Sequence, residues 1–297
     1  MGLLNTLRYI TSHPLNRASR FKALSRFAAW QLRSRIGAGR TIFPWINDTK
    51  LVVGRGETGL TGNIYCGLHE FEDMAFVLHF LRDTDLFVDV GANAGSYTVL
   101  AAGVSQCHAM AIEPIPSTFV RLLDNVHVNC LSARVECLNI GIGREAGVLT
   151  FTSAYDTVNR VVADNEARAG AIDIPVKTLD EIVPGSAPVV MKIDVEGYEA
   201  NVIAGASGLL TSGAVAAVIM EINENSSRYG SDEFDLHQRM QQLGYSACSY
   251  APFTRELTPV RVAGERAGNN TIYVRDLSAA RARLAQARSF RVFSHVI

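Results

Sequence analysis

The sequence lacks the features of a membrane-spanning or secreted protein. It contains no run of about 18 apolar residues, so no transmembrane helix is predicted. Arginines interrupt every apolar stretch near the N-terminus, and we therefore expect no secretory signal. The five cysteines are odd in number and none has C-x-x-C spacing, which predicts neither a disulfide framework nor a zinc site. These absences favour a reducing, cytoplasmic location.

Acidic residues are absent from the first 40 positions, which hold eight arginines and lysines. The net charge of the chain is −1, so the remaining residues carry 20 basic against 29 acidic side chains. A mildly acidic body argues against a nucleic-acid-binding surface. With 297 residues, the chain is long enough to bury a large core. We expect one globular α/β domain with basic appendages.

Apolar residues recur at helical spacing within the basic segment, at Phe21, Leu24, Phe27, Ala28 and Leu32. Most of the neighbouring arginines lie off this stripe. A basic amphipathic helix can lie on an anionic membrane surface. It can equally pack its apolar stripe on the domain. We therefore expect either peripheral contact of residues 1–40 with the inner face of a membrane or packing of this segment on the domain.

The chain is organised around residues 87–98, which read F-V-D-V-G-A-N-A-G-S-Y-T. An apolar run typical of a buried strand breaks at Gly91 and Gly95, and helix-compatible residues follow. The two glycines are four positions apart, so the dinucleotide-binding pattern G-x-G-x-x-G is absent. A strand, turn and helix of this kind can still present backbone N–H groups to a carboxylate or phosphate.

Glu113 ends the next predicted strand, 22 residues after Gly91. An acid at about this interval accepts ribose hydroxyls in nucleoside-binding folds. At this point the sequence resembles class I S-adenosylmethionine-dependent methyltransferases, and within them the FkbM family. The resemblance covers roughly residues 65–250 and is carried by residues 87–98, Glu113-Pro114, 139–143, 178–180 and 192–199.

The resemblance implies S-adenosylmethionine as the cofactor. The residues that we expect to bind it are Glu70, Asp89, Gly91, Ala92, Asn93, Gly95, Glu113, Asn139 and Gly141. The turn from Gly91 to Gly95 would hold the methionine end, with Asp89 ordering it; Glu113 would accept the ribose hydroxyls, and 139–141 would border the adenine. Gly67, Glu70 and Glu72 match a family segment that closes over the methionine end. Those acids can also simply favour the start of a helix.

Strands and helices alternate from residue 86 onward, which predicts a doubly wound, Rossmann-like and mostly parallel sheet. Residues 245–249 and 271–274 complete the pattern as a hairpin at the sheet edge. We expect residues 1–63 to form a basic extension of helix and short strands. Residues 64–276 would then form the methyltransferase domain, and residues 277–297 a basic C-terminal helix or tail.

Polar residues follow five predicted strands, and in open α/β sheets ligands bind at the carboxyl ends of strands. They are Asp89 with Gly91, Glu113, Asn139 with Gly141, Asp194, and Glu221 with Asn223. This edge is acidic, and no lysine or arginine lies at the glycine turn. A pyrophosphate would favour cations there. The pattern therefore favours S-adenosylmethionine over NAD.

Methyl transfer to a hydroxyl requires a base that removes its proton. Asp194 is the leading catalytic candidate, with Lys192 on the same face of its strand and Glu196 just beyond. Lys192 and Asp194 can instead form a structural ion pair. His69 is the other candidate base, because histidine titrates near neutrality.

Asp194, Glu196 and Glu221 could serve as oxygen ligands to a metal, although no histidine–carboxylate spacing supports one and none is predicted. The resemblance implies O-methylation of a hydroxyl on a sugar, a glycan or a secondary metabolite. An N-methyltransferase and a non-catalytic S-adenosylmethionine-binding module with a membrane-surface role are the alternatives.

Overall fold

The computed structural model describes residues 2–36, 39–152, 159–162, 170–185, 188–222, 224–230, 233–260 and 270–297. Its centre is an eight-stranded sheet with the order β12-β11-β13-β10-β9-β3-β4-β5. The strands are β3 (Leu86–Val90), β4 (His108–Ile112), β5 (Val135–Leu138), β9 (Val189–Ile193), β10 (Val215–Glu221), β11 (Ser246–Ala251), β12 (Glu256–Pro259) and β13 (Asn270–Val274). The five strands from β10 to β5 are parallel, and the others are antiparallel. The predicted doubly wound, mostly parallel sheet is confirmed.

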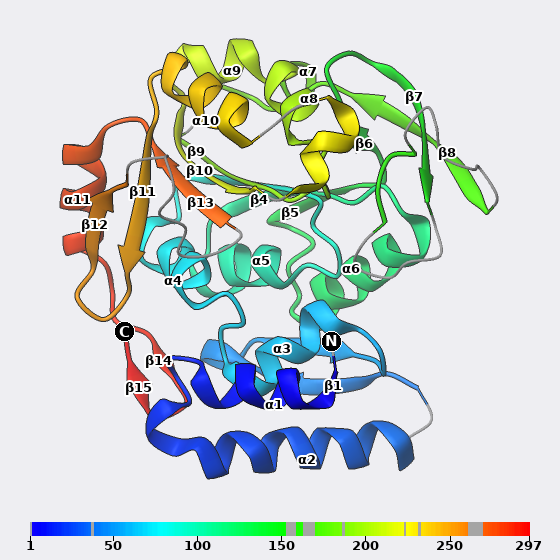
Figure 1. The fold of residues 1–297 in the computed structure, drawn as a ribbon, viewed down its shortest axis with the longest axis vertical. Helices are drawn as coiled ribbons and strands as arrows, with labels where there is room; N and C mark the ends of the chain where they lie inside the picture. The colour runs from blue at the N-terminus through cyan, green and yellow to red at the C-terminus, as the bar shows by residue number, and fades with distance from the viewer. Residues whose placement is uncertain are drawn as a thin grey trace.

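The central strands are apolar on both sides, so both faces of the sheet must be covered. Helices cover them. Phe87 of β3 belongs to one core, with side chains from α4 (Phe71–Phe80), α6 (Pro116–Val128) and α11 (Leu277–Ala285). Val88, the next residue, belongs to a second core with α8 (Glu199–Ala204), α9 (Ser207–Ser212) and α10 (Glu233–Gln242). Figure 1 shows these two helical layers on opposite sides of the sheet. Successive side chains of one strand therefore point to opposite faces of the sheet and belong to different cores.

The predicted hairpin at the sheet edge is wrong in its position. β11 and β13 do pair, with Ser246 opposite Val274, but β13 lies between β10 and β11. Tyr273 and Val274 are fully buried, which requires cover on both faces of the strand. The strand at this edge of the sheet is β12, which the sequence pattern did not indicate.

A separate three-stranded sheet with the order β6-β8-β7 is formed by the residues between β5 and β9. It contains β6 (Gly141–Ile142), β7 (Gly147–Thr152) and β8 (Ala171–Lys177). In β8, buried Ile174 and Val176 alternate with exposed Asp173, Pro175 and Lys177, so the strand is buried on one face only.

Several helices of this domain are short or divided. The glycine turn leads into α5 (Ser96–Val99), which continues as the π-helical turn η3 (Leu100–Val104). The residues after β9 form two short helices, α8 and α9. Short elements at other positions are η5 (Glu224–Tyr229) and α7 (Leu179–Ile182), which is capped by Thr178 and Glu181.

The N-terminal residues form a layer of their own, drawn in blue in Figure 1. It contains α1 (Leu3–Ser12), η1 (Arg17–Ser19), α2 (Arg20–Ile36), β1 (Thr41–Pro44), η2 (Ile46–Asp48), β2 (Lys50–Val53) and α3 (Thr58–Cys66). Ile10, Trp30, Leu51 and Ile64 form its small core. α3 crosses the expected boundary at residue 63, and the division into three segments stays a prediction.

The C-terminal residues return to this layer. After α11, the hairpin of β14 (Arg291–Val292) and β15 (His295–Val296) lies beside the N-terminal helices. His295 Nε2 lies 3.1 Å from the carbonyl oxygen of Leu15, and the Arg26 guanidinium lies 3.8 Å above the Phe293 ring. Within the described ranges, no helix combines the length and apolar character needed to cross a bilayer.

Candidate active site

The carboxyl ends of β4, β3, β9 and β10 meet at one edge of the sheet. Val90 is opposite both Ile112 and Ile193, and Ile193 is opposite Met220, so these strands end in register. The polar residues expected at this edge therefore come together. Asn223, which was also expected there, lies outside the residues that the structure describes.

Gly91 allows the chain to pass directly beside the end of β9. Its φ is +78°, and a Cβ atom at this position would lie 1.9 Å from the carbonyl oxygen of Asp194. The N–H of Asp194 in turn donates to the carbonyl of Val90 at 3.0 Å. Asp89, buried in β3, accepts a hydrogen bond of 2.6 Å from the Thr98 hydroxyl. The glycine turn, β9 and α5 are thus fixed to one another.

Hydrogen bonds from its backbone N–H groups hold the turn, several of them to the end of β4. The N–H groups of Gly91 and Ala92 both donate to the carbonyl of Ile112, at 3.0 and 2.9 Å. The N–H of Gly95 donates to Ala92, and Gly95 has a φ of +85°. Between positions 91 and 95, the turn's N–H groups are therefore engaged within the chain, and free donors can come only from α5 onward.

Glu113 is buried beside this turn. Its carboxylate accepts hydrogen bonds of 2.9 Å from the N–H groups of Asn93 and Ile115. Burial raises the pKa of Glu113 to about 7, although these N–H groups oppose the shift. Asn139 donates to the carbonyls of Glu113 and Pro114 at 2.8 and 2.9 Å, so its amide holds the end of β4.

A narrow cavity of about 20 Å³ lies between the glycine turn and the small sheet. Gly91, Pro114, Gly141, Phe151 and Tyr198 are among the residues that line it. A Cβ atom at Gly141 would lie 2.9 Å from the Phe151 ring, so the glycine provides the space that the ring occupies. The cavity is smaller than a purine, and a purine could enter only if these aromatic side chains moved.

On the other side of the turn, Lys192 is a buried cation within a group of carboxylates. Its Nζ donates to Asp194 Oδ2 at 2.6 Å and lies 4.7 Å from the centre of the Tyr97 ring. Burial alone would lower the pKa of Lys192, but the nearby carboxylates of Asp194, Glu70 and Asp89 outweigh it and raise the pKa. Lys192 therefore carries a positive charge at the end of β9.

Three carboxylates gather beyond this lysine. Ligand atoms of Asp194, Glu196 and Glu221 all lie within 4.8 Å of one another. Burial, followed by the negative charge of Asp194, raises the pKa of Glu221 to about 9 and that of Glu196 to about 7. Near neutral pH, Glu221 is therefore protonated and shares a hydrogen bond with Asp194. The same oxygens could also hold a hard cation.

Three further residues of this edge were not identified from the sequence. Tyr97 donates to Glu70 Oε2 at 2.7 Å. Asn270 donates to Glu70 Oε1 at 3.2 Å and to Asp73 Oδ2 at 3.0 Å. Asn270 is opposite Glu221 in the antiparallel pair of β13 and β10, which brings the first residue of β13 to this edge. Asn270 could be identified only from the pairing of β13 with β10, which the sequence pattern does not indicate.

His69 lies in a different environment. Its Nδ1 is 2.8 Å from the Tyr9 hydroxyl, which also donates to the His69 carbonyl at 2.7 Å. Burial lowers the pKa of this imidazole. The described contacts thus connect His69 to α1 in the N-terminal layer, while its neighbour Glu70 contacts Tyr97 and Asn270.

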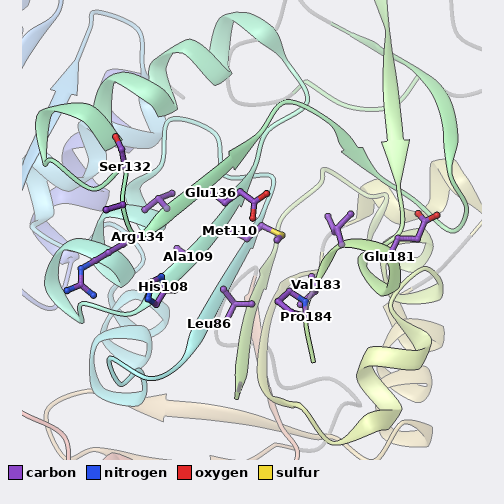
Figure 2. Close-up of a pocket in the computed structure, with 13 residues that line it drawn as sticks. Leu86, His108, Ala109, Met110, Ser132, Arg134, Glu136, Glu181, Val183 and Pro184 are labelled. Carbon is purple, nitrogen blue, oxygen red and sulfur yellow. The ribbon is translucent and has the colours of Figure 1, made fainter. Parts of the chain in front are cut away.

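A larger cavity lies elsewhere. It has a volume of about 770 Å³ and is lined by the first residues of β3, β4 and β5 and by α7, among them Leu86, His108 and Val183. Figure 2 shows these side chains around the amino ends of the strands. None of the predicted site residues lines it. The chemistry of the carboxyl edge, rather than cavity size, marks the candidate site.

The sequence matches the model of a known protein family. The model described as "Methyltransferase FkbM domain" matches residues 89–247. The hexuronic acid methyltransferase AglP of Haloferax volcanii is 29% identical over 157 residues, which are 52% of this chain and 62% of that protein. The chain thus spans less than two thirds of the length of this curated relative.

Two solved methyltransferase structures are also similar. TYW2 of M. jannaschii in complex with AdoMet is 14% identical, with a TM-score of 0.37, and the match covers 80% of this chain and 86% of that one. Precorrin-6y C5,15-methyltransferase of Geobacter metallireducens is 12% identical, with a TM-score of 0.38, covering 69% and 86%. Because both TM-scores are below 0.5, the fold assignment rests on the sheet described above.

Proposed function

This chain belongs to the FkbM methyltransferase family and uses S-adenosylmethionine, and we propose that it methylates a hydroxyl oxygen of a sugar or glycan. The observation that carries the proposal is the ion pair of Lys192 and Asp194. It lies at the end of β9, where the Asp194 carbonyl also contacts Gly91 of the glycine turn. The carboxylate that we propose as the base thus lies directly beside the turn where the family resemblance puts the methyl donor.

The residues present fit the cofactor. A ribose requires an acceptor for its hydroxyls, and Glu113 is a buried carboxylate that the N–H groups of Asn93 and Ile115 hold in place. A sulfonium requires surroundings without excess positive charge. Lys192, a cation at this edge, is paired with Asp194 and faces further carboxylates.

Roles follow from these positions. We assign Glu113 to the ribose hydroxyls and the surroundings of Asn139 and Gly141 to the adenine. The turn from Gly91 to Gly95 would provide shape more than donors, because its N–H groups are already paired. Asp89 would keep this turn in place through Thr98. Glu70, held by Tyr97 and Asn270, would border the methionine end.

The bound cofactor supplies an electrophilic methyl group, and the protein must align and deprotonate the acceptor. We assign the proton to Asp194, whose carboxylate would accept it from the hydroxyl as the new bond from oxygen to carbon forms. Lys192 would hold this carboxylate in position. Glu196, with its pKa of about 7, is the neighbouring group that could relay the proton to solvent.

The acceptor side favours a neutral compound with several hydroxyls. Asp73, Glu70, Asp194 and Glu196 offer oxygens that accept hydrogen bonds, and Asn270 lies among them. An anionic acceptor would be repelled by the same carboxylates. In this respect we expect the chain to differ from its hexuronic acid relative.

Labelled S-adenosylmethionine and a panel of neutral sugars, uronic acids and amino sugars test the proposal. We expect the label in a neutral sugar, as a methyl ether that survives mild alkali. A label released by mild alkali would indicate a methyl ester and would contradict hydroxyl methylation. Transfer to the nitrogen of an amino sugar would favour the N-methyltransferase alternative.

A further inference from the structure

The helix α2 forms the outer boundary of the N-terminal layer, farthest from the central sheet (Figure 1). One side of it packs inward: Ala23 and Trp30 are buried, and the Phe27 ring lies 5.2 Å from that of Tyr65. Arg26 also points inward, where it donates to the carbonyl of Tyr65. The helix therefore packs on the rest of the protein, as one of the two expectations had it, but through only one of its faces.

The opposite face is apolar and exposed. The side chains of Phe21, Leu32 and Ile36 are 84%, 62% and 77% exposed. With exposed Ser25 and Ala28 they repeat every three or four residues, which places them on one stripe of the helix. The apolar stripe read from the sequence is thus divided: Phe27 packs inward, while Phe21 and Leu32 face away from the protein.

Exposed cations border this stripe on both sides. Lys22 and Arg33 follow one edge, and Arg35 lies along the other. In the part of the chain that the structure describes, none of the three forms an ion pair. The first acid of the sequence is Asp48, beyond the helix. The outer face therefore joins unneutralised positive charge to a row of large apolar side chains.

We propose that this face of α2 binds an anionic lipid bilayer, with the helix lying parallel to the membrane surface. An apolar stripe between two rows of cations is the arrangement that suits the boundary between acyl chains and charged headgroups. A second copy of the chain would bring like charges together on this face. A nucleic acid would satisfy the cations but would leave the apolar stripe without a partner.

Co-sedimentation of the full chain with vesicles tests this proposal independently of methyl transfer. The vesicles are phosphatidylcholine alone and phosphatidylcholine with phosphatidylglycerol. We expect binding to the anionic vesicles, weakened at about 0.5 M salt because the headgroup attraction is screened. Phe21→Ser/Leu32→Ser/Ile36→Ser should lower the partition coefficient at least about tenfold, since three apolar side chains no longer insert.

Two further variants sharpen the result. Lys22→Gln/Arg33→Gln should lower binding at low salt by about fivefold for each cation removed. Phe234→Ser is the matched control, because Phe234 is 62% exposed on α10, on the other side of the sheet. It should bind as the wild type does. All variants change exposed residues, and thermal melting verifies that they are folded.

Three results would overturn the proposal. The wild-type protein could fail to sediment with anionic vesicles, or the triple variant could sediment as the wild type does. The third is a wild-type dimer that the triple variant converts to a monomer while neither binds vesicles, which would make the face an interface between two copies.

Discussion

Gly91 and Asp194 are in such close contact that a single added carbon atom would separate the glycine turn from the end of β9. The predicted Cβ position is 1.9 Å from the Asp194 carbonyl oxygen, and the φ of +78° is one that side chains disfavour. This contact joins the residues proposed for the cofactor to those proposed for the acceptor. A change that breaks this contact should therefore disturb both the cofactor site and the acceptor site.

Gly91→Ala should therefore lower both stability and cofactor affinity. Backbone strain and overlap at this contact should cost about 1–3 kcal/mol or more in the free energy of unfolding, measured in urea. Gly147→Ala is the control, because nothing lies within 4 Å of a Cβ at that position and its backbone is extended. Equal stability of the two variants would show that the contact is not as close as described.

Glu113→Ala should weaken S-adenosylmethionine binding by about 1–3 kcal/mol, since a buried hydrogen-bond acceptor for the ribose is lost. Calorimetry measures the affinity directly. Glu136→Ala, an exposed acid in β5, serves as the control. Unchanged affinity in a folded Glu113→Ala protein would remove this residue from the site.

The raised pKa of Glu221 predicts how stability depends on pH. With a folded-state pKa of about 9 and an ordinary value of 4.5, the native state keeps a proton between these limits that the unfolded state has lost. The free energy of unfolding should therefore fall as the pH rises from 7 to 8, by up to about 1.4 kcal/mol.

Glu221→Gln cannot lose this proton and should therefore reduce the slope, and the part that remains belongs to other buried acids such as Glu113 and Glu196, whose pKa values are about 7. Urea unfolding at both pH values measures it for the wild type and the variant. A wild-type slope that the variant retains would assign the proton to another group.

Chelation of divalent metals should leave methyl transfer unchanged. In the proposed arrangement Lys192 supplies the positive charge beside Asp194, and Glu221 is protonated rather than available as a charged ligand. Turnover is measured after EDTA treatment and again with added Mg²⁺. Activity that EDTA abolishes and Mg²⁺ restores would instead make Asp194, Glu196 and Glu221 metal ligands.

The features predicted from the sequence are those that depend on short stretches. The apolar run and glycines of residues 87–95 gave the strand and turn, and the position of Asp194 just after a buried strand placed it at the carboxyl edge. Lys192 and Asp194 were expected on one face because side chains alternate along a strand, and they form an ion pair.

The features that were missed depend on contacts between distant segments. Asn270 reaches Glu70 and Asp73 across 200 and 197 residues, and it does so only because β13 runs antiparallel beside β10. Periodicity does not reveal which strands pair. The contact between His69 and Tyr9 likewise depends on how α1 packs, and no pattern within either segment indicates it.

The most direct test of the central claim is the single-turnover rate of Asp194→Asn, with the acceptor that the sugar panel identifies. The variant keeps the size of the side chain but cannot take up the proton of the acceptor. We predict a folded protein with nearly unchanged cofactor affinity and a rate lower by roughly 10²–10⁴-fold. A folded Asp194→Asn enzyme that transfers methyl groups at the wild-type rate would contradict the account.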